Sequence, residues 1–262
     1  MNLYIGTDIE GVAGVFSFEK QAYSDGKYNE DAKKLLTGEV NAAIEGALEA
    51  GVGKIIVSDG HGSGGIHYES LHEKARIIQG RPRLPKGQWY GKGVCDVSCM
   101  IGQHAMEGAF RGNLNHTQSS QGVDYYKLNG KYIGETAQMA LNMGAFGVPV
   151  IFLSGDTAAC REAEELIPGI TTCAVKDGIS RGCAASLSMI ASRKMIRAKM
   201  KEAVLKHQHK PIKPLVWKGP YRLEIRLKHS DIADGYENRG WQRIDTKTVA
   251  IKSDKITDII CS

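Results

Sequence analysis

Four residues that can bind a metal ion each follow a short apolar segment of the chain: Asp8, Glu10, His61 and His104. Asp8 and Glu10 are two positions apart, so both carboxylates point to one face if strand geometry continues through them. If the apolar segments are parallel strands, their carboxyl ends meet at one edge of the sheet, where open α/β sheets gather their working groups. Two carboxylates and two imidazoles from separate strands can therefore converge.

This set of ligand types favours a particular kind of metal site. Oxygen and nitrogen donors without thiolates are typical of a catalytic zinc site, whereas closed structural sites usually recruit cysteines. One more carboxylate would supply enough ligands for two ions, with Asp8 bridging them at roughly 3.5–4 Å. Glu135 is a candidate because it opens a predicted helix, although its spacing alone does not distinguish it from the other glutamates.

Each of these residues also has an ordinary structural explanation. An Asp-x-Glu pair at a strand end often accepts hydrogen bonds from loop amides, and a single histidine is often a hydrogen-bonded structural residue. The glycine-rich stretch 60–65 could instead cradle a phosphate, although it lacks the lysine and hydroxyl of a P-loop. Asp59, two residues before His61, could orient a ligand or cap its own loop.

The elements that would position these residues alternate between strands and helices. Apolar residues at helical spacing predict a helix over Asn29–Ala50, which Gly51 ends. The strands Leu3–Asp8 and Lys54–Val57 on either side of it form a predicted parallel βαβ unit. Later segments continue the alternation, with strands near 75–78, 94–101 and 148–153 and helices near 134–143, 158–166 and 186–205. The pattern predicts a three-layer α/β fold, with a mostly parallel sheet flanked by helices.

The second half of the chain contains antiparallel signals. Asn129-Gly130 between two strand-like segments predicts a hairpin with a type I′ turn. After about residue 210, Pro211 and Pro214 interrupt the helical pattern, and strand-like stretches follow at 221–227 and 246–252. We therefore expect a catalytic α/β domain over residues 1–205 and a small C-terminal α+β subdomain over residues 206–262.

Composition narrows the class of protein. A chain of 262 residues with 42% hydrophobic composition can bury a large core, and its six cysteines include no C-x-x-C pair. No apolar run reaches the roughly 18 residues of a membrane span, and the first residues do not resemble a secretory signal peptide. The net charge of +5 is mild, and the basic run 206–210 lacks the interleaved aromatics of a single-strand binder. We expect a soluble cytoplasmic protein that binds neither nucleic acid nor membrane.

Several separated motifs together resemble the D-aminopeptidase family of zinc metallopeptidases. They occur in the family's order and at similar spacing over about the first 190 residues, and the likeness thins towards the C-terminal part. The motifs are Leu3–Gly14, Val57–His61, Gly102–Ala105, Asn115–Thr117, Ile133–Glu135, Leu153–Asp156 and Glu162–Thr172.

The resemblance implies roles for particular residues and a way of assembling. The family's ligands for two zinc ions per subunit correspond to Asp8, Glu10, His61, His104 and Glu135, with Asp8 shared between the ions. His116 corresponds to the family's catalytic histidine, although from sequence alone it passes for a surface residue. The expected reaction is hydrolysis of a small peptide with an N-terminal D-amino acid, in a ring-shaped homo-oligomer.

Two other functions fit parts of the same pattern. A metal-dependent amidohydrolase acting on a non-peptide amide would share the metal site and differ in the pocket, and a panel of substrates would distinguish it. A non-catalytic module could hold a nucleotide or sugar at the glycine-rich stretch 60–65. The intact set of five ligand candidates argues against that module, because a site that no longer binds metal has no physical reason to keep several costly carboxylates together.

Overall fold

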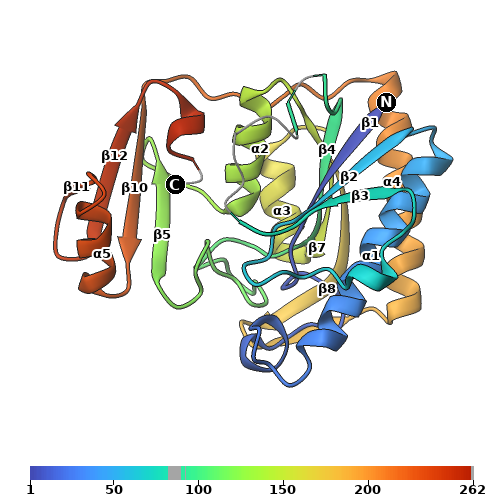
Figure 1. Ribbon diagram of the computed structural model, residues 1–262, viewed down its shortest axis with the longest axis horizontal. Helices are drawn as coiled ribbons and strands as arrows, with labels where there is room; N and C mark the ends of the chain where they lie inside the picture. Colours follow the sequence, from blue (N-terminus) through green and yellow to red (C-terminus); the bar gives the residue numbers. More distant parts are fainter. Residues whose placement is uncertain (82–89, 92, 261–262) are drawn as a thin grey trace.

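The computed structural model describes residues 1–81, 90–91 and 93–260, and its larger sheet forms the centre of the molecule (Figure 1). Six strands of this sheet run parallel, and the seventh pairs antiparallel with its neighbour at one edge. The order of the strands is β3 (Ala75–Ile78), β2 (Lys54–Asp59), β1 (Asn2–Thr7), β4 (Val97–Gln103), β7 (Val150–Asp156), β8 (Thr171–Ser180) and β9 (Cys183–Ser186).

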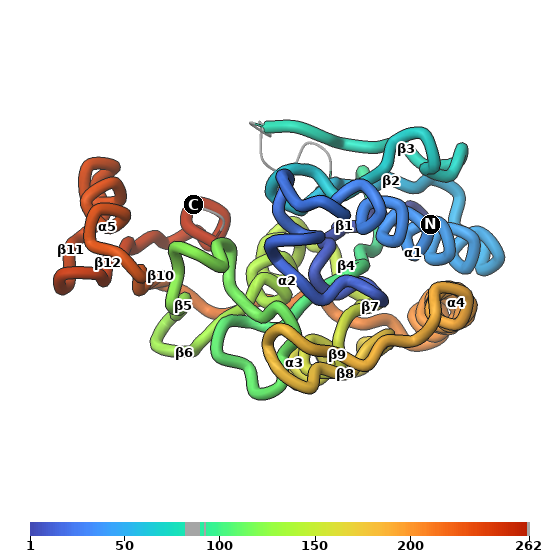
Figure 2. The backbone as a smooth tube through the Cα atoms, turned by 90° about the horizontal axis from the view of Figure 1, so that it is seen from below, coloured from blue at the N-terminus to red at the C-terminus, as the bar shows by residue number. Residues whose placement is uncertain are grey.

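Helices cover both faces of this sheet, as Figures 1 and 2 show. The helices α1 (Asn29–Glu49) and α4 (Met189–His209) pack on each other and on one face. The helices α2 (Glu135–Ala145) and α3 (Thr157–Leu166) lie on the other. The prediction of a three-layer α/β fold with a mostly parallel sheet is therefore confirmed.

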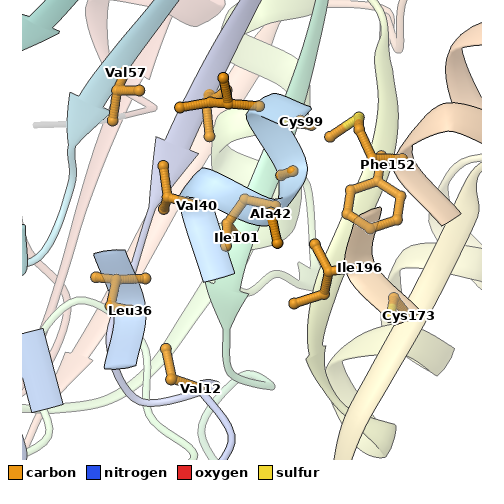
Figure 3. Close-up of a cluster of buried hydrophobic side chains, with 14 of the residues drawn as sticks. Val12, Leu36, Val40, Ala42, Val57, Cys99, Ile101, Phe152, Cys173 and Ile196 are labelled. Atoms are coloured by element: carbon orange, nitrogen blue, oxygen red, sulfur yellow. The ribbon is translucent and has the colours of Figure 1, made fainter. Parts of the chain in front are cut away.

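The main hydrophobic core lies between the sheet and the pair α1 and α4 (Figure 3). Leu36 and Val40 are one helical turn apart on α1 and belong to the same buried cluster as Ile101 of β4, while Ile196 of α4 lies near Phe152 of β7. All five side chains are fully buried. This apolar layer holds the strands rigidly, and their carboxyl ends are therefore fixed relative to one another.

A smaller antiparallel sheet lies beyond α2 and projects from the main body (Figure 2). Its apolar side chains pack against α2, and α5 (Ser230–Glu237) lies against it. The order of its strands is β11 (Gln242–Arg243), β12 (Thr248–Ser253), β10 (Tyr221–Leu227), β5 (Val123–Leu128) and β6 (Lys131–Tyr132). The hairpin of β5 and β6 turns at Asn129 and Gly130, whose φ angles of 51° and 81° confirm the predicted type I′ geometry.

The small sheet combines segments that are far apart in the sequence. β5 pairs with β10, so the hairpin belongs with the C-terminal strands rather than with the central sheet. The sheet thus crosses the predicted boundary between residues 205 and 206. A division of the chain into two domains at that boundary stays a prediction, and residues 261 and 262 of the expected subdomain lie outside the described residues.

The structure differs locally from the sequence prediction in two ways. The segment expected to begin a helix at Ser186 first completes the hairpin of β8 and β9, and α4 begins at Met189 after the capping side chain of Ser188. Three short helical turns were also not expected: η1 (Phe18–Ala22), η2 (Tyr68–Ser70) and η3 (Ile256–Asp258). Across the described ranges, no helix is both long and apolar enough to cross a membrane.

Candidate metal centre

The predicted ligands meet at the carboxyl ends of three neighbouring strands. Asp8 follows β1, His61 comes two residues after β2, and His104 follows β4. Glu10 lies in the same loop as Asp8, and Glu135 is the first residue of α2. The structure brings all five side chains together, as the strand order β2-β1-β4 requires.

Asp8 is the central residue of this cluster. Its Oδ1 lies 3.2 Å from Nδ1 of His61, and its Oδ2 lies 3.1 Å from Nε2 of His104. On one side, Oε2 of Glu10 lies 3.3 Å from the same nitrogen of His61. On the other, Oε1 of Glu135 lies 3.4 Å from Nε2 of His104. The two oxygens of one carboxylate thus face two groups of candidate ligands, so one carboxylate is within reach of both groups.

The histidine rings are oriented as metal ligands normally are. Nε2 of His61 lies 2.8 Å from the carbonyl oxygen of Ala22, and Nδ1 of His104 lies 2.9 Å from that of Ala105. Because a carbonyl oxygen only accepts, each of these nitrogens carries the proton. The other nitrogen of each ring then faces the carboxylates, where a cation can take the place of its proton, and backbone partners of this kind fix ligand histidines in metalloproteins.

Electrostatics supports a cation at this position. Burial alone would raise the pKa of Asp8, but His104 and His61 hold it well below its usual value. Burial alone would lower the pKa of His61, yet its bonds to Asp8 and Glu10 raise it to about 11. Among the described residues, Oε2 of Glu10 and Nε2 of His104 are buried without a well-formed hydrogen bond. Three clustered carboxylates and these two ligand atoms without a hydrogen bond therefore fit divalent cations. Binding of a cation displaces protons from the histidines.

His116 lies directly beside these ligands. Its ring stacks on that of His104 with centroids 3.9 Å apart, and it makes an edge-to-face contact with the ring of Phe18 at 5.4 Å between centroids. Nδ1 donates to the carbonyl of Leu114 at 3.0 Å, so the unprotonated Nε2 faces Glu135 at 3.9 Å. Burial and the positive charge of His104 lower the pKa of His116. The ring is therefore neutral and presents a base to the site.

Close backbone approach holds the ligand loops together. The N–H of Gly11 donates to the carbonyl of Gly102 at 2.7 Å, so the loop after β1 crosses the end of β4. A Cβ atom on Gly11 would lie 2.0 Å from the carbonyl oxygen of Gln103, and one on Gly102 would lie 2.1 Å from that of Asp8. Gly102 also has a φ of +77°, which L side chains rarely adopt. Both positions require glycine.

Asp59 caps its own loop, which was the more ordinary of its two explanations. Its Oδ1 accepts from the amide of Gly65 at 2.8 Å, and its Oδ2 accepts from that of Ile66 at 3.2 Å. The glycine-rich stretch 60–65 is thereby folded around a carboxylate. That charge disfavours a phosphate in the same turn.

Sequence reasoning missed other groups that hold the site. The amide of Gln118, a residue with a φ of 64°, donates to Oε1 of Glu135 at 2.7 Å. Oε2 of Glu162 accepts from the amide of Met106 at 2.9 Å and so supports the segment after His104. In the sequence, Gln118 and Glu162 could have been found only because they lie inside or near the family-like motifs. Neither their spacing nor their residue type indicates a role at the site.

A large pocket opens over the cluster. Its volume is 1140 Å³, and Asp8, Glu10, His61, His116 and Glu135 form part of its wall. The rest of the wall includes Tyr4, Tyr23, Tyr90, Gln118 and Arg81. Such a volume can hold a small peptide together with the groups that recognise it.

A parallel α/β sheet that gathers carboxylates and imidazoles beneath an open pocket defines a metal-dependent hydrolase. A family model for D-aminopeptidases, Peptidase_M55, matches residues 1–261. A D-aminopeptidase of Bacillus subtilis (strain 168) is 32% identical over 220 residues, which cover 82% of this chain and 78% of that protein. The chain belongs to the D-aminopeptidase family, and it is a metallo-aminopeptidase.

A solved structure has the same fold. It is described as the Zn-dependent D-aminopeptidase DppA from Bacillus subtilis, a self-compartmentalizing protease. The two structures superpose with a TM-score of 0.91 at 27% sequence identity, and the match covers all of this chain and 94% of that one. The similarity to D-aminopeptidases predicted from the separated motifs is confirmed, including in the C-terminal part where the motifs thin.

Proposed function

We propose that this chain is a zinc-dependent aminopeptidase that releases an N-terminal D-amino acid from small peptides at a two-metal site. The ligands in this proposal are Asp8, Glu10, His61, His104 and Glu135. The single observation that carries it is that the two oxygens of Asp8 face imidazole nitrogens on opposite sides, at 3.2 and 3.1 Å. One carboxylate placed in this way can join two ions.

The donor set supports zinc as the metal. Imidazole and carboxylate donors suit zinc, and the related DppA is described as Zn-dependent. When bound, zinc supplies a Lewis acid that polarises a carbonyl and makes water nucleophilic near neutral pH. Asp8, Glu10 and His61 would hold one ion, while Asp8, His104 and Glu135 would hold the other.

His116 is the proposed catalytic residue. Its Nδ1–H is held by the carbonyl of Leu114, so Nε2 is free to accept a proton while the water oxygen bonds to the scissile carbonyl carbon. When the C–N bond breaks, the same nitrogen can return that proton to the leaving amine. Stacking on His104 and contact with Phe18 keep the ring in place for both steps. In its protonated form the imidazolium can also stabilise the oxyanion.

The pocket supports a short substrate with a free carboxylate. Of the described residues that line it, Arg81 is the only lysine or arginine. Its Nη2 donates to the carbonyl of Gly60 at 3.3 Å, which holds the guanidinium one residue away from the ligand His61. A guanidinium pairs well with a carboxylate, whereas the carboxylates at the metal centre would repel one. We infer that Arg81 receives the C-terminal carboxylate of the peptide.

The proposal extends to assembly into a ring-shaped homo-oligomer. DppA is described as a self-compartmentalizing protease, and this chain has its fold from end to end. Enclosing the pocket among subunits would exclude folded proteins and admit small peptides. Light scattering coupled to size-exclusion chromatography tests this, and a monomer at micromolar concentration would contradict it.

The function is tested with a pair of chromogenic substrates. Purified protein is assayed on D-alanine p-nitroanilide and on its L-isomer, before chelation, after chelation and after zinc is restored. We expect release of p-nitroaniline from the D-isomer, its loss with the chelator and its return with zinc. Inactivity on both isomers by protein that carries two zinc ions would instead indicate a hydrolase of non-peptide amides.

A further inference from the structure

A buried lysine lies beneath the metal centre and takes no part in the proposed chemistry. Lys176 is in β8, and only 2% of its surface is exposed. Its Nζ donates to the carbonyl of Glu10, to the carbonyl of Val15 at 2.6 Å and to Oδ1 of Asn113 at 2.8 Å. An ammonium group has three N–H donors, and here three oxygen acceptors surround it.

These acceptors belong to two different loops. Glu10 and Val15 lie in the loop after β1, which also carries Asp8. Asn113 lies in the segment that leads to His116. Lys176 therefore joins the backbone of one proposed zinc ligand to the segment that carries the proposed catalytic histidine.

Asn113 transmits this link to the histidine. It is fully buried, its amide donates to Oδ2 of Asp156 at 2.8 Å, and its Nδ2 donates to the carbonyl of Arg181 at 3.0 Å. The next residue, Leu114, has a φ of 52° and supplies the carbonyl that holds Nδ1 of His116. A shift of Asn113 would thus change the direction in which Nε2 of His116 points.

The charge of the ammonium is compensated within the fold. Burial lowers the pKa of Lys176 from 10.5 to about 8, and the charges of Asp156, Glu39 and Glu10 oppose part of that shift. A neutral side chain at this position would leave three acceptors unpaired and these buried carboxylates without a cation, and both changes are costly. Lysine therefore suits this position because of its three donors and its charge, and not only because of its packing.

We propose that Lys176 is a positioning residue. Its buried ammonium fixes the position of the loop that carries Glu10 relative to the segment that carries His116. The inference rests on the proposed function, because it concerns the same zinc site and the same reaction. Lys176 acts through Glu10 and through Asn113 and touches neither substrate nor metal. Its loss should affect zinc affinity and turnover, and leave substrate recognition by the pocket wall in place.

The first test replaces Lys176 with methionine, which has a similar length and no donor. We expect the zinc affinity of Lys176→Met, measured by competition with a chromophoric chelator, to fall about tenfold to hundredfold, as for other residues that orient metal ligands. We expect kcat for D-alanine p-nitroanilide to fall by a similar factor, while KM changes by less than about threefold.

The matched control separates positioning from general loss of stability. Ile196→Ala opens a cavity in the core near Phe152, removes no hydrogen-bonding group, and should lower the melting temperature of the metal-free protein. At a temperature well below unfolding, its zinc affinity and kcat should equal those of the wild type. If Lys176→Met behaves like Ile196→Ala, with a lower melting temperature only, the positioning role is overturned.

A second pair of variants keeps the inference testable if Lys176→Met does not fold. Asn113→Ala removes the acceptor on the His116 segment, and we expect kcat to fall about tenfold while zinc affinity is kept. Asn113→Asp retains an oxygen acceptor for Lys176 but loses the donor to the carbonyl of Arg181, so it should recover part of this loss. Equal kcat in Asn113→Ala and the wild type would overturn the link to His116.

The wild-type measurements distinguish failure of this inference from failure of the proposed function. A wild-type protein that neither binds zinc nor cleaves the anilide contradicts the zinc aminopeptidase itself. A wild type that does both, beside a Lys176→Met variant with the same zinc affinity and the same kcat, contradicts the role of Lys176 alone.

Discussion

The imidazole ring of His116 stacks on that of His104, with ring centroids 3.9 Å apart and planes inclined by 18°. Each Nδ1 is held by a backbone carbonyl, so both Nε2 atoms face the carboxylate of Glu135, at 3.9 and 3.4 Å. A proposed ligand and the proposed catalytic residue thus converge on one carboxylate. His116 and Glu135 both line the pocket over the cluster.

Replacement of His116 should separate turnover from metal binding. We expect His116→Ala to keep the zinc content of the wild type and to lower kcat roughly a hundredfold or more, because a proton acceptor and donor is lost while the ligands remain. Steady-state kinetics and metal analysis by mass spectrometry measure the two quantities. His209→Ala, at the exposed end of α4, is the control. Full activity in His116→Ala would remove this residue from the mechanism.

Replacement of Asp8 should be more severe. Because its two oxygens face both groups of ligands, Asp8→Ala should lose both zinc ions and with them nearly all activity. Metal content per chain is the direct measurement. Asp25→Ala removes an acidic residue from the wall of the same pocket and should retain both ions. Two ions retained in Asp8→Ala would refute the bridging assignment.

Arg81 should determine the preference for a free carboxylate. We expect Arg81→Gln to raise KM for D-alanyl-D-alanine about tenfold, the size of one charge-assisted hydrogen bond, and to leave KM for the dipeptide amide unchanged. Any effect of the substitution on the metal centre changes KM for the dipeptide and for its amide alike, so the ratio of the two KM values reports on carboxylate recognition. Arg239→Gln, whose guanidinium packs on Tyr236 in the small sheet region, is the control. An equal rise for both substrates would contradict carboxylate recognition.

Glu39 should make stability depend on pH. Burial raises the pKa of its carboxyl from 4.5 to about 7 in the folded protein, although it accepts a hydrogen bond from the amide of Ala13. Since the folded state holds this proton more tightly than the unfolded state, the contribution of this group to stability is full below pH 4.5, falls as pH rises from 4.5 to about 7, and is absent above that. The loss from this one group is about 3 kcal/mol.

The variant Glu39→Gln tests this assignment. It keeps the oxygen that accepts from Ala13 and cannot ionise, so we expect its free energy of unfolding to exceed that of the wild type more at pH 8 than at pH 5. Urea denaturation of the two metal-free proteins at both pH values gives the difference, in which the contributions of titrating groups that do not interact with Glu39 cancel. A constant difference across this range would show that Glu39 does not titrate there.

Local patterns in the sequence were sufficient for much of the fold. The helix α1 and the Asn129-Gly130 hairpin were predicted closely, because helical periodicity and left-handed turn residues act over a few neighbouring positions. The strand β8 was not predicted. Its burial does not alternate regularly, since Lys176 is turned inwards to polar loops rather than outwards to water. Pairing of the hairpin with β10 also escaped prediction, because it joins segments about a hundred residues apart.

The sequence by itself determined which types of metal ligand stand at the strand ends. Its family resemblance indicated which of these residues belong to one metal site. Only the tertiary structure decided that the oxygens of Asp8 face opposite histidines and that His116, in an unremarkable polar segment, lies against His104. Lys176 could not be found from its sequence neighbours, because its acceptors at Val15 and Asn113 are 161 and 63 residues away. Hydrogen bonds and ion pairs depend on distance in space, and distant segments reach that range only after the apolar layers have packed.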